Sequence, residues 1–423
     1  MLKKFMIVIC LWMISISMIQ PIKAEETLSI GSEHAVLINL NDNLVVFSKA
    51  ADEKTYPASI TKVMSALVAI EHMDRLDEKV VFTKDMFKGL YEAEASLAGF
   101  EVGEKATMED LLYGTLLASG AEAVNGLAYK TAGSVPSFVK LMNKKAKQLG
   151  MNHTNFTNPT GLHDDNHYTT CNDLAKLLQA AIKNKEFYKI FCAKQYQTSK
   201  TNKNSKGLIF KSTLSRQIQS LNYKADYIKG GKTGFTPEAG MCLASVAKNK
   251  KDAYLLITTQ NGHDNLEPYN VMDAIKVYDY YFDHYENRIV KRKGEELLRV
   301  NVLWNFSNKE FVYESKNDLS ALVPKGINNE DIKFNYVGNS DIKTPVKKGA
   351  LLGTLEIKAN KEVVKSIEIH ALKSVDRNFV LYYCDKIGDF FEQNRSLLLI
   401  GIASFISLGI GLIWYKKNKH YIK

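Results

Sequence analysis

The sequence predicts an α+β protein, in which an antiparallel sheet carries a helical cluster and is followed by a small all-β domain and one C-terminal transmembrane helix. Three observations predict this architecture. Strand-like patterns at residues 32–49 and 240–261 enclose a long segment of helical patterns. Alternation of apolar and polar residues returns at residues 350–372, where the helical periodicity has stopped. An uncharged apolar run, residues 396–415, then has the length of a helix that crosses a bilayer.

The first domain is predicted from its strand and helix patterns in chain order. Residues 32–49 alternate around the turn sequence Asn-Asp-Asn, which predicts two strands of a hairpin. Residues 59–73 place apolar side chains at helical spacing, and residues 107–132 predict a helix, a turn and a second helix. Residues 240–261 predict another hairpin with a lysine-rich turn, and residues 267–285 predict a closing helix.

The domain boundaries follow from where these patterns change. We expect the first domain over residues 25–290, a small β domain over residues 291–375 and a juxtamembrane segment over residues 376–395. The β domain is predicted because residues 350–372 alternate apolar and polar side chains about the turn sequence Ala-Asn-Lys.

Both ends of the chain have the composition of targeting segments. Residues 1–24 combine lysines near the start, an apolar run and a final alanine, which predicts a secretory signal peptide. Residues 396–415 predict a single membrane span, and the tail of residues 416–423 holds four lysines and no acidic residue. Because positively charged flanks stay in the cytoplasm, this tail is expected inside the cell and the preceding domains outside the cell membrane.

The net charge of +10 is concentrated in these terminal segments. Seven of the ten net positive charges lie in residues 1–24 and 396–423, which leaves a net charge of +3 on residues 25–395. Much of the basicity therefore reflects membrane topology, and we expect no nucleic-acid partner.

Ser59 and Lys62 lie three residues apart, just after Pro57, where a helix is predicted to begin. Positions i and i+3 are neighbours on a helix surface, so the amine of Lys62 can reach the hydroxyl of Ser59. A serine hydroxyl needs a base to become a nucleophile, and a lysine acts as a base only when its pKa is lowered. The pair suits acyl transfer, but taken alone a helix cap beside a solvated lysine is the simpler interpretation.

The sequence Lys232-Thr233-Gly234-Phe235 stands at the start of a predicted apolar strand. The ammonium group of Lys232 can lower the pKa of the base lysine, and the hydroxyl of Thr233 can bind a substrate carboxylate. Gly234 lets another segment approach the strand closely, and the N–H of Phe235 can form an oxyanion hole together with that of the nucleophilic serine. Taken alone, this sequence also fits a glycine-rich turn.

Ser119 falls at the turn between two predicted helices, 60 residues after Ser59 and 113 before Lys232. Its hydroxyl can relay a proton from the base to a leaving amine. The order S-x-x-K, a serine turn and K-T-G corresponds to the set found in penicillin-binding proteins and class A β-lactamases. Each motif alone is weak evidence, but three motifs in this order, each in a fitting local context, together strongly indicate this set of catalytic residues.

The chain resembles the low-molecular-mass penicillin-binding proteins, specifically the serine-type D-alanyl-D-alanine carboxypeptidases of peptidase family S11. The resemblance covers about residues 25–285 and lies in the stretches YPASITKVM, EVGEKATMEDLLYGTLLASGAEA, NPTGLHDDNHYTT and GGKTGFTPEAG. It implies a five-stranded antiparallel sheet with a helical cluster. The β domain and the membrane tail also look like those of the family.

The resemblance implies an activity as well. Such an enzyme removes the terminal D-alanine from the peptidoglycan stem pentapeptide through an acyl-serine intermediate, requires no cofactor and is acylated by β-lactam antibiotics such as penicillin. Ser59 would be the nucleophile, Lys62 the general base and Ser119 the proton relay. The expected substrate-binding residues are Lys232, Thr233, Gly234 and Phe235.

One position departs from the family pattern, because Ser119-Gly120-Ala121 stands where the family usually has Ser-x-Asn. An alanine cannot hold the substrate amide, so a non-catalytic peptidoglycan-binding relative is one alternative. A class A β-lactamase is another, although the glutamate that activates the deacylating water in that class has no convincing counterpart here.

His163 and His167 are spaced like the H-x-x-x-H core of a zinc peptidase. The glutamate that would act as general base is missing, since Asp164 stands in its place, and the preceding Asn-Pro-Thr-Gly composition predicts a loop. We therefore expect no metal at this position. The cysteines that follow the predicted signal form no C-x-x-C pair and are expected to be separate core or surface residues.

Overall fold

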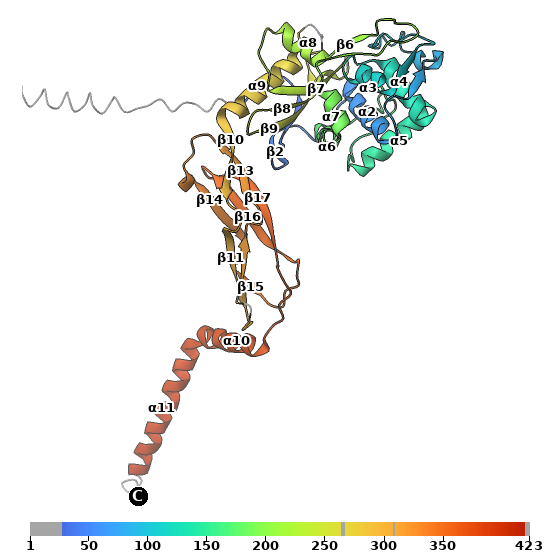
Figure 1. Cartoon of the computed structure of the whole chain (residues 1–423). Coiled ribbons are helices and arrows are strands. Elements are labelled where there is room, and N and C mark those ends of the chain that lie inside the picture. The colour runs from blue at the N-terminus through green and yellow to red at the C-terminus, as the bar shows by residue number, and fades with distance from the viewer. Residues whose placement is uncertain (1–27, 264–266, 308, 419–423) are drawn as a thin grey trace, which may run out of the picture. The chain divides into compact units, whose positions relative to one another are not determined.

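The computed structural model describes residues 28–263, 267–307 and 309–418. The chain divides into two compact units, Met1–Tyr285 and Glu286–Lys423 (Figure 1). The predicted secretory signal lies outside the described residues, as do the last five residues of the predicted cytoplasmic tail.

The first unit is built on a five-stranded antiparallel sheet with the strand order β2-β1-β9-β8-β7. Its strands are β1 (His34–Asn39), β2 (Leu44–Lys49), β7 (Ile228–Thr236), β8 (Gly240–Lys248) and β9 (Ala253–Asn261). Both predicted hairpins are present, as β1–β2 and β8–β9, and the predicted α+β class is confirmed. Because β8 and β9 are buried on both faces, they are almost continuously apolar. β7 lies at the edge of the sheet, so one side of its backbone is open to a substrate.

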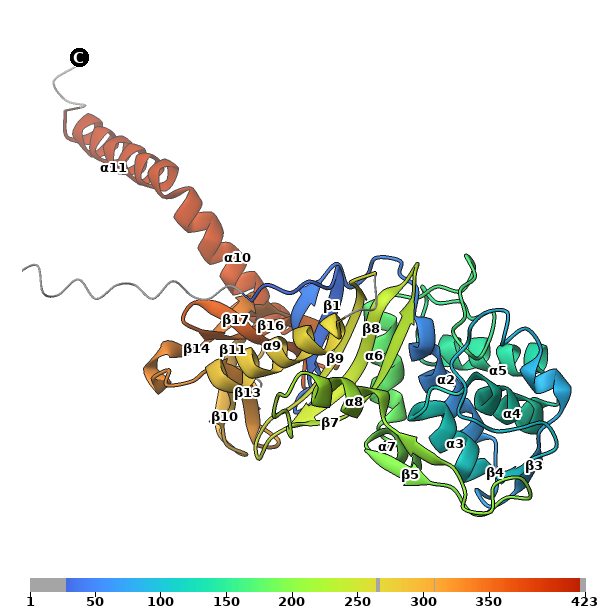
Figure 2. The same ribbon diagram turned by 90° about the horizontal axis from the view of Figure 1, so that it is seen from above.

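Helices cover both faces of this sheet (Figure 2). The helix α9 (Tyr269–His284) packs against β8 and β9 on one face, and α6 (Cys171–Ala181) packs against β1 and β9 on the other. The remaining helices of the unit are α2 (Thr61–Glu71), α3 (Met108–Leu116), α4 (Ala121–Ala132), α5 (Val135–Gln148), α7 (Lys185–Phe191) and α8 (Thr213–Ser220). Of these, α2 is buried on all sides from Thr61 to Ala69, as expected of a helix that is apolar all round.

Short elements connect the helices of the first unit. They are η1 (Ala58–Ile60), η2 (Lys84–Phe87), β3 (Lys79–Val81), β4 (Lys105–Thr107), β5 (Gln195–Gln197) and β6 (Ile209–Lys211). The strands β3 and β4 form one short antiparallel pair, and β5 and β6 form another. The four cysteines of the described residues are free thiols, in agreement with the expectation from their spacing.

The second unit is an all-β module that is followed by two helices. Its elements are β10 (Tyr285–Lys291), β11 (Glu296–Leu303), β12 (Glu310–Glu314), β13 (Leu319–Pro324), η3 (Asn329–Asp331), β14 (Ile332–Gly338), β15 (Asp341–Lys343), β16 (Leu351–Ala359), β17 (Glu362–His370), α10 (Phe379–Gln393) and α11 (Arg395–Asn418). The predicted hairpin of residues 350–372 is present as the antiparallel pair β16–β17. Within α11, residues Leu399–Lys417 are long and apolar enough to cross a membrane, and none of this segment is buried.

Candidate active site

A cleft of about 770 Å³ opens beside the edge strand β7. Its walls come from the turn before α2, the start of α4, the loop of residues 160–162, α8 and the end of β7. Six of the seven predicted site residues line it: Ser59, Lys62, Ser119, Thr233, Gly234 and Phe235. The seventh, Lys232, is fully buried behind the cleft wall.

The nucleophile candidate Ser59 lies in the 3-10 turn η1, directly before α2. Pro57 caps this turn, and Ala58 has a φ of +44°, a conformation that costs an alanine free energy. Strained residues of this kind persist where the surrounding fold over-determines them, often at functional sites. The turn exposes the Ser59 hydroxyl to the cleft, and the helix α2, which follows directly, fixes its position.

The base candidate Lys62 is on the first turn of α2 and reaches back to the serine. Its Nζ lies 2.9 Å from Oγ of Ser59 and 2.6 Å from the carbonyl oxygen of Thr160, to which it donates. The predicted i, i+3 contact is therefore present. The contact with Thr160 orients the amine, and no local sequence pattern predicts it because the two residues are 98 positions apart.

Ser119 connects the remaining lysine to the nucleophile. The Ser119 hydroxyl donates to Oγ of Ser59 at 3.1 Å, and Lys232 Nζ donates to Oγ of Ser119 at 3.0 Å. Lys232 also donates to the carbonyl oxygen of Thr233 at 2.7 Å. Ser119 has a φ of +62°, so the turn between α3 and α4 holds it in a left-handed conformation. The result is a continuous chain of polar contacts that joins Lys232, Ser119, Ser59 and Lys62.

Burial lowers the pKa of both lysines of the site, Lys62 and Lys232. It lowers the pKa of Lys62 to about 7, against the opposing effect of the Glu122 carboxylate. Burial and the nearby Lys62 ammonium together lower the pKa of Lys232 well below its ordinary value. A lysine with a pKa near 7 is partly neutral at physiological pH, as a general base must be. A nearby cation is one way to lower the pKa of a lysine, but at Lys62 the main cause is burial.

Glu122 is an acidic residue of this site that is not among the predicted site residues. It lies in the first turn of α4, three positions after Ser119, and is fully buried. Its Oε1 accepts hydrogen bonds from the backbone N–H groups of Ala98, Gly99 and Phe100 at 2.7, 2.8 and 3.2 Å. Burial raises the pKa of the carboxyl, and these three donors oppose that rise. In the sequence, Glu122 stands out only as an acidic residue at the start of an otherwise apolar helix.

The loop that carries Thr160 is fixed to the nucleophile helix by His167. The N–H of Thr157 donates to Nδ1 of His167 at 3.1 Å, so Nε2 carries the proton and donates to Thr61 Oγ1 at 2.8 Å. Burial lowers the pKa of His167 to about 4, which keeps the ring neutral. In the same loop, a Cβ atom on Gly161 would lie 1.9 Å from the carbonyl oxygen of Ala58. The glycine therefore permits the close approach that brings Thr160 to the base.

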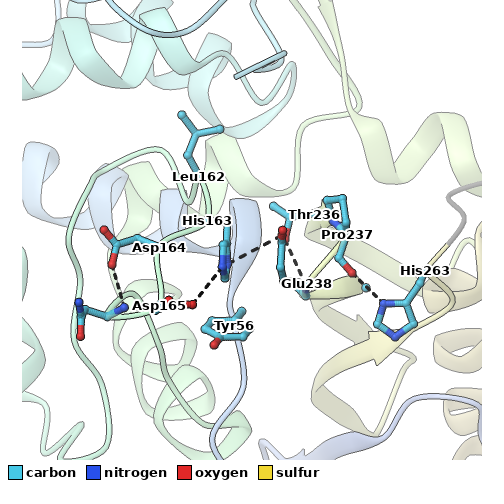
Figure 3. A network of polar contacts seen from close by, with 12 residues as sticks. Tyr56, Leu162, His163, Asp164, Asp165, Thr236, Pro237, Glu238 and His263 are labelled. Carbon is cyan, nitrogen blue, oxygen red and sulfur yellow. Dashed lines mark hydrogen bonds and ion pairs between the residues drawn. The ribbon is translucent and has the colours of Figure 1, made fainter. Parts of the chain in front are cut away.

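The other histidine of the zinc-like spacing has different neighbours (Figure 3). His163 lies 3.5 Å from the carboxylate of Asp165 and 3.8 Å from that of Glu238, and it packs edge-on against Tyr56. His167 is occupied by its two threonine contacts, so the two rings do not converge on one point. Within residues 28–263, 267–307 and 309–418 no group of three His, Cys, Asp or Glu side chains is arranged to hold a metal ion.

The substrate-binding candidates lie on β7 beside the nucleophile turn. A Cβ atom on Gly234 would be 3.0 Å from the backbone nitrogen of Ser59, so the glycine permits the predicted close approach. The Thr233 hydroxyl donates to Oγ1 of Thr213 at 2.7 Å, which ties β7 to the start of α8. Ala121 also lines the cleft, at the start of α4, and offers only a methyl group there.

Comparisons with known proteins agree with this geometry. Residues 21–261 match the family model for D-alanyl-D-alanine carboxypeptidase, and residues 285–377 match the model for the C-terminal domain of penicillin-binding protein 5. The D-alanyl-D-alanine carboxypeptidase DacF of Bacillus subtilis is 29% identical over 87% of this chain and 92% of its own length.

Two solved structures show the same fold. Penicillin-binding protein 5 of Haemophilus influenzae superposes with a TM-score of 0.66 at 22% identity, over 82% of this chain and 98% of that one. The Streptomyces K15 DD-transpeptidase has a TM-score of 0.54 at 31% identity, over 60% of this chain and 98% of that one. With both domains matched and the serine–lysine geometry in the cleft, the chain belongs to the serine-type D-alanyl-D-alanine carboxypeptidases of peptidase family S11, within the low-molecular-mass penicillin-binding proteins.

Proposed function

We propose that this protein is a membrane-anchored carboxypeptidase that removes the terminal D-alanine from peptidoglycan stem pentapeptides through an acyl-serine intermediate. The observation that carries the proposal is the polar chain from Lys232 through Ser119 and Ser59 to Lys62, with a base whose pKa is about 7. It supplies a nucleophile, a base and a path for the proton to the leaving group.

In the acylation step, neutral Lys62 accepts the proton of the Ser59 hydroxyl while Oγ attacks the carbonyl carbon of the penultimate D-alanine. The N–H groups of Ser59 and Phe235 stabilise the oxyanion that forms. When the tetrahedral intermediate collapses, the carbon–nitrogen bond breaks, and the leaving D-alanine takes the proton through the Ser119 hydroxyl. Water then attacks the acyl ester and releases the shortened peptide.

The terminal carboxylate of the substrate binds to the Thr233 hydroxyl, which lines the cleft. Lys232 is fully buried and contacts Ser119 instead, so it acts through the orientation of that hydroxyl. In this arrangement β-lactam antibiotics acylate Ser59, because they present a carbonyl and a carboxylate in the same relation.

Membrane anchoring is supported by the two C-terminal helices. α11 contains the apolar segment Leu399–Lys417, and Lys416 and Lys417 at its end favour a cytoplasmic C-terminus. On α10 the exposed apolar side chains are Phe379, Val380, Tyr383, Ile387, Phe390 and Phe391.

Deleting residues 396–423 should move the protein out of the integral membrane fraction while D-alanine release continues. Loss of D-alanine release from a folded truncated protein would contradict a purely anchoring role.

The activity is tested by incubating the full chain in detergent with a peptide that ends in D-Ala-D-Ala and measuring free D-alanine. We expect release that depends on Ser59 and is unaffected by EDTA. Binding of the peptide without release of D-alanine would instead support a non-catalytic relative, for which Ala121 gives the structural reason. Rapid hydrolysis of penicillin, in place of a long-lived adduct, would support a β-lactamase.

A further inference from the structure

A second cavity, of about 590 Å³, is lined by α8 and by the start of β7, two elements that lie side by side (Figure 2). On α8, Leu214 and Ile218 line this second cavity. Thr213 and Gln217 line the catalytic cleft instead, so the two cavities lie against different faces of the helix. Of the described residues that line the two cavities, only Arg216 is common to both. The acyl-transfer mechanism uses none of the residues that line the second cavity.

Cationic side chains dominate the lining of this second cavity, which we call the basic cavity. Its charged lining residues are five cations and one acid, and all six are exposed: Lys194, Lys211, Arg216, Lys224, Lys229 and Asp226. Within the part of the chain that the structure describes, the side chains of Lys211, Arg216 and Lys224 form no hydrogen bond or ion pair. These three cations are therefore free to bind an anionic ligand.

Contacts between the strands bring these cations to one opening. The N–H of Ser212, which directly follows Lys211, donates to the carbonyl oxygen of Lys194 at 2.9 Å. The Nζ of Lys194 lies 3.9 Å from the carboxylate of Asp226, and the Nζ of Lys229 donates to the backbone carbonyl of Asp226 at 2.8 Å. The β5–β6 pair and the start of β7 therefore present their lysines around the same acidic residue.

The inner part of the basic cavity is apolar and closely packed. Its buried lining residues include Leu214, Ala225 and Ile228. A Cβ atom on Gly230 would lie 2.6 Å from the carbonyl oxygen of Phe191, so β7 packs directly against the segment before β5. The cations therefore surround a recess that the fold holds in place.

The charge of the first domain is concentrated in the same segment. Residues 194–229 contain eight lysines and arginines and one acidic residue, a net charge of +7. Since residues 25–395 together carry a net charge of +3, the rest of that stretch carries a net charge of −4. A basic region on an otherwise acidic chain attracts a polyanion to this region and repels it elsewhere.

We propose that the basic cavity binds a linear phosphodiester polyanion, which enters as a free chain. Four of the five cations are lysines, whose compact ammonium groups suit phosphate, whereas carboxylates are matched best by the planar fork of arginine. Ser215, Gln219 and Asn222 also line the cavity and supply uncharged hydrogen-bonding groups. A recess of this size admits a chain, whereas the surface of an anionic bilayer would reach only its rim.

The probe that tests this inference is a short, fluorescently labelled glycerol phosphate oligomer, added to the full chain in a neutral detergent. Fluorescence anisotropy would give its Kd over a range of salt concentrations. We expect saturable binding that weakens as salt rises, because each phosphate that pairs with a lysine releases a counterion.

Two charge-matched triple variants localise the binding. Lys211→Gln, Lys224→Gln and Lys229→Gln together should raise Kd by about tenfold or more, since each exposed charge pair contributes about two- to fivefold. The control on α5 replaces Lys140, Lys144 and Lys147 by Gln, outside the basic cavity, and should keep the wild-type Kd. Penicillin acylation serves as the folding check, because none of these lysines lines the catalytic cleft.

Asp226→Asn gives a prediction of opposite sign. The substitution removes the one carboxylate of the cavity lining and frees Lys194, so Kd should fall by about two- to fivefold. A variant that merely disturbed the structure would not bind the probe more tightly. An unchanged or higher Kd would contradict the assigned site.

Three further outcomes would overturn the proposal. Equal loss of binding in the two triple variants would mean that the probe responds only to net charge. Equal affinity for a glutamate oligomer of the same charge would show that the cavity takes an acidic peptide. Displacement of the probe by phosphatidylglycerol mixed into the detergent micelles would show that the cavity binds lipid headgroups in place of a free chain.

Discussion

Gly161→Ala is expected to disable the nucleophile while the protein stays folded. Gly161 has a φ of +81°, and an added Cβ would lie 1.9 Å from the carbonyl oxygen of Ala58 and 3.0 Å from the nitrogen of Ser59. Ordinary contacts begin at 3.4 Å, so either the Thr160 loop or the Ser59 turn must move by about 1.5 Å. A misplacement of about 1 Å can cost about 100-fold in rate.

The positive φ adds a separate cost to stability. An alanine in the left-handed region loses about 1–2 kcal/mol, whatever the space around it. Gly150→Ala is the matched control, because Gly150 has a φ of +69° and an added Cβ would meet no atom within 4 Å. Both variants should therefore lower the melting temperature, and Gly161→Ala should lower it more than Gly150→Ala because its clash with Ala58 adds to the cost of the positive φ.

The assay is the rate of acylation by a fluorescent penicillin, measured with the full chain in detergent beside a thermal unfolding curve. We expect Gly161→Ala to acylate about 100-fold more slowly than the wild type and Gly150→Ala to acylate at the wild-type rate. If the two variants acylate within threefold of each other, the contact between the Thr160 loop and the nucleophile turn does not hold the reacting groups in place.

Two further predictions concern the base and the departure from the family motif. kcat/KM should rise with pH through about 7 as Lys62 loses its proton. Glu122→Gln should move this rise to lower pH, because the carboxylate of Glu122 stabilises the ammonium form of Lys62. A pH–rate profile that moves to higher pH in the variant would contradict the assignment of Lys62 as the base. Ala121→Asn should raise D-alanine release by about 2- to 13-fold, the value of one restored neutral hydrogen bond of about 0.5–1.5 kcal/mol; a decrease would mean that the cleft has adapted to the methyl group.

The parts of the site that depend on local spacing could be predicted from the sequence. A three-residue spacing at a helix start fixes the contact between Ser59 and Lys62. The K-T-G stretch is in a strand, but it lies in the second half of the edge strand β7 and not at the start of an apolar strand, as the sequence pattern predicts. The order of strand and helix patterns was enough for the α+β class, because alternation and helical periodicity are properties of short segments.

The rest depends on contacts between distant residues. No local sequence pattern reveals that the carbonyl oxygen of Thr160 contacts the base Lys62. The same holds for the hydrogen bonds that the carboxylate of Glu122 accepts from residues 98–100. The helix α8 is short and flanked by polar segments, so its role as a wall of the cleft was not predicted. The burial that lowers the pKa of Lys62 comes from packing around α2, and only its apolar composition hinted at it.

The central claim is that Ser59 is the acylated nucleophile, and mass mapping of the penicillin adduct tests it most directly. The full chain in detergent would be labelled with penicillin, digested and analysed by mass spectrometry, beside the Ser59→Ala variant. We predict that the added mass lies on Ser59, and that Ser59→Ala loses both the adduct and D-alanine release because the nucleophile itself is gone. An adduct on another serine, or D-alanine release by Ser59→Ala within tenfold of the wild type, would contradict the acyl-serine mechanism at this site.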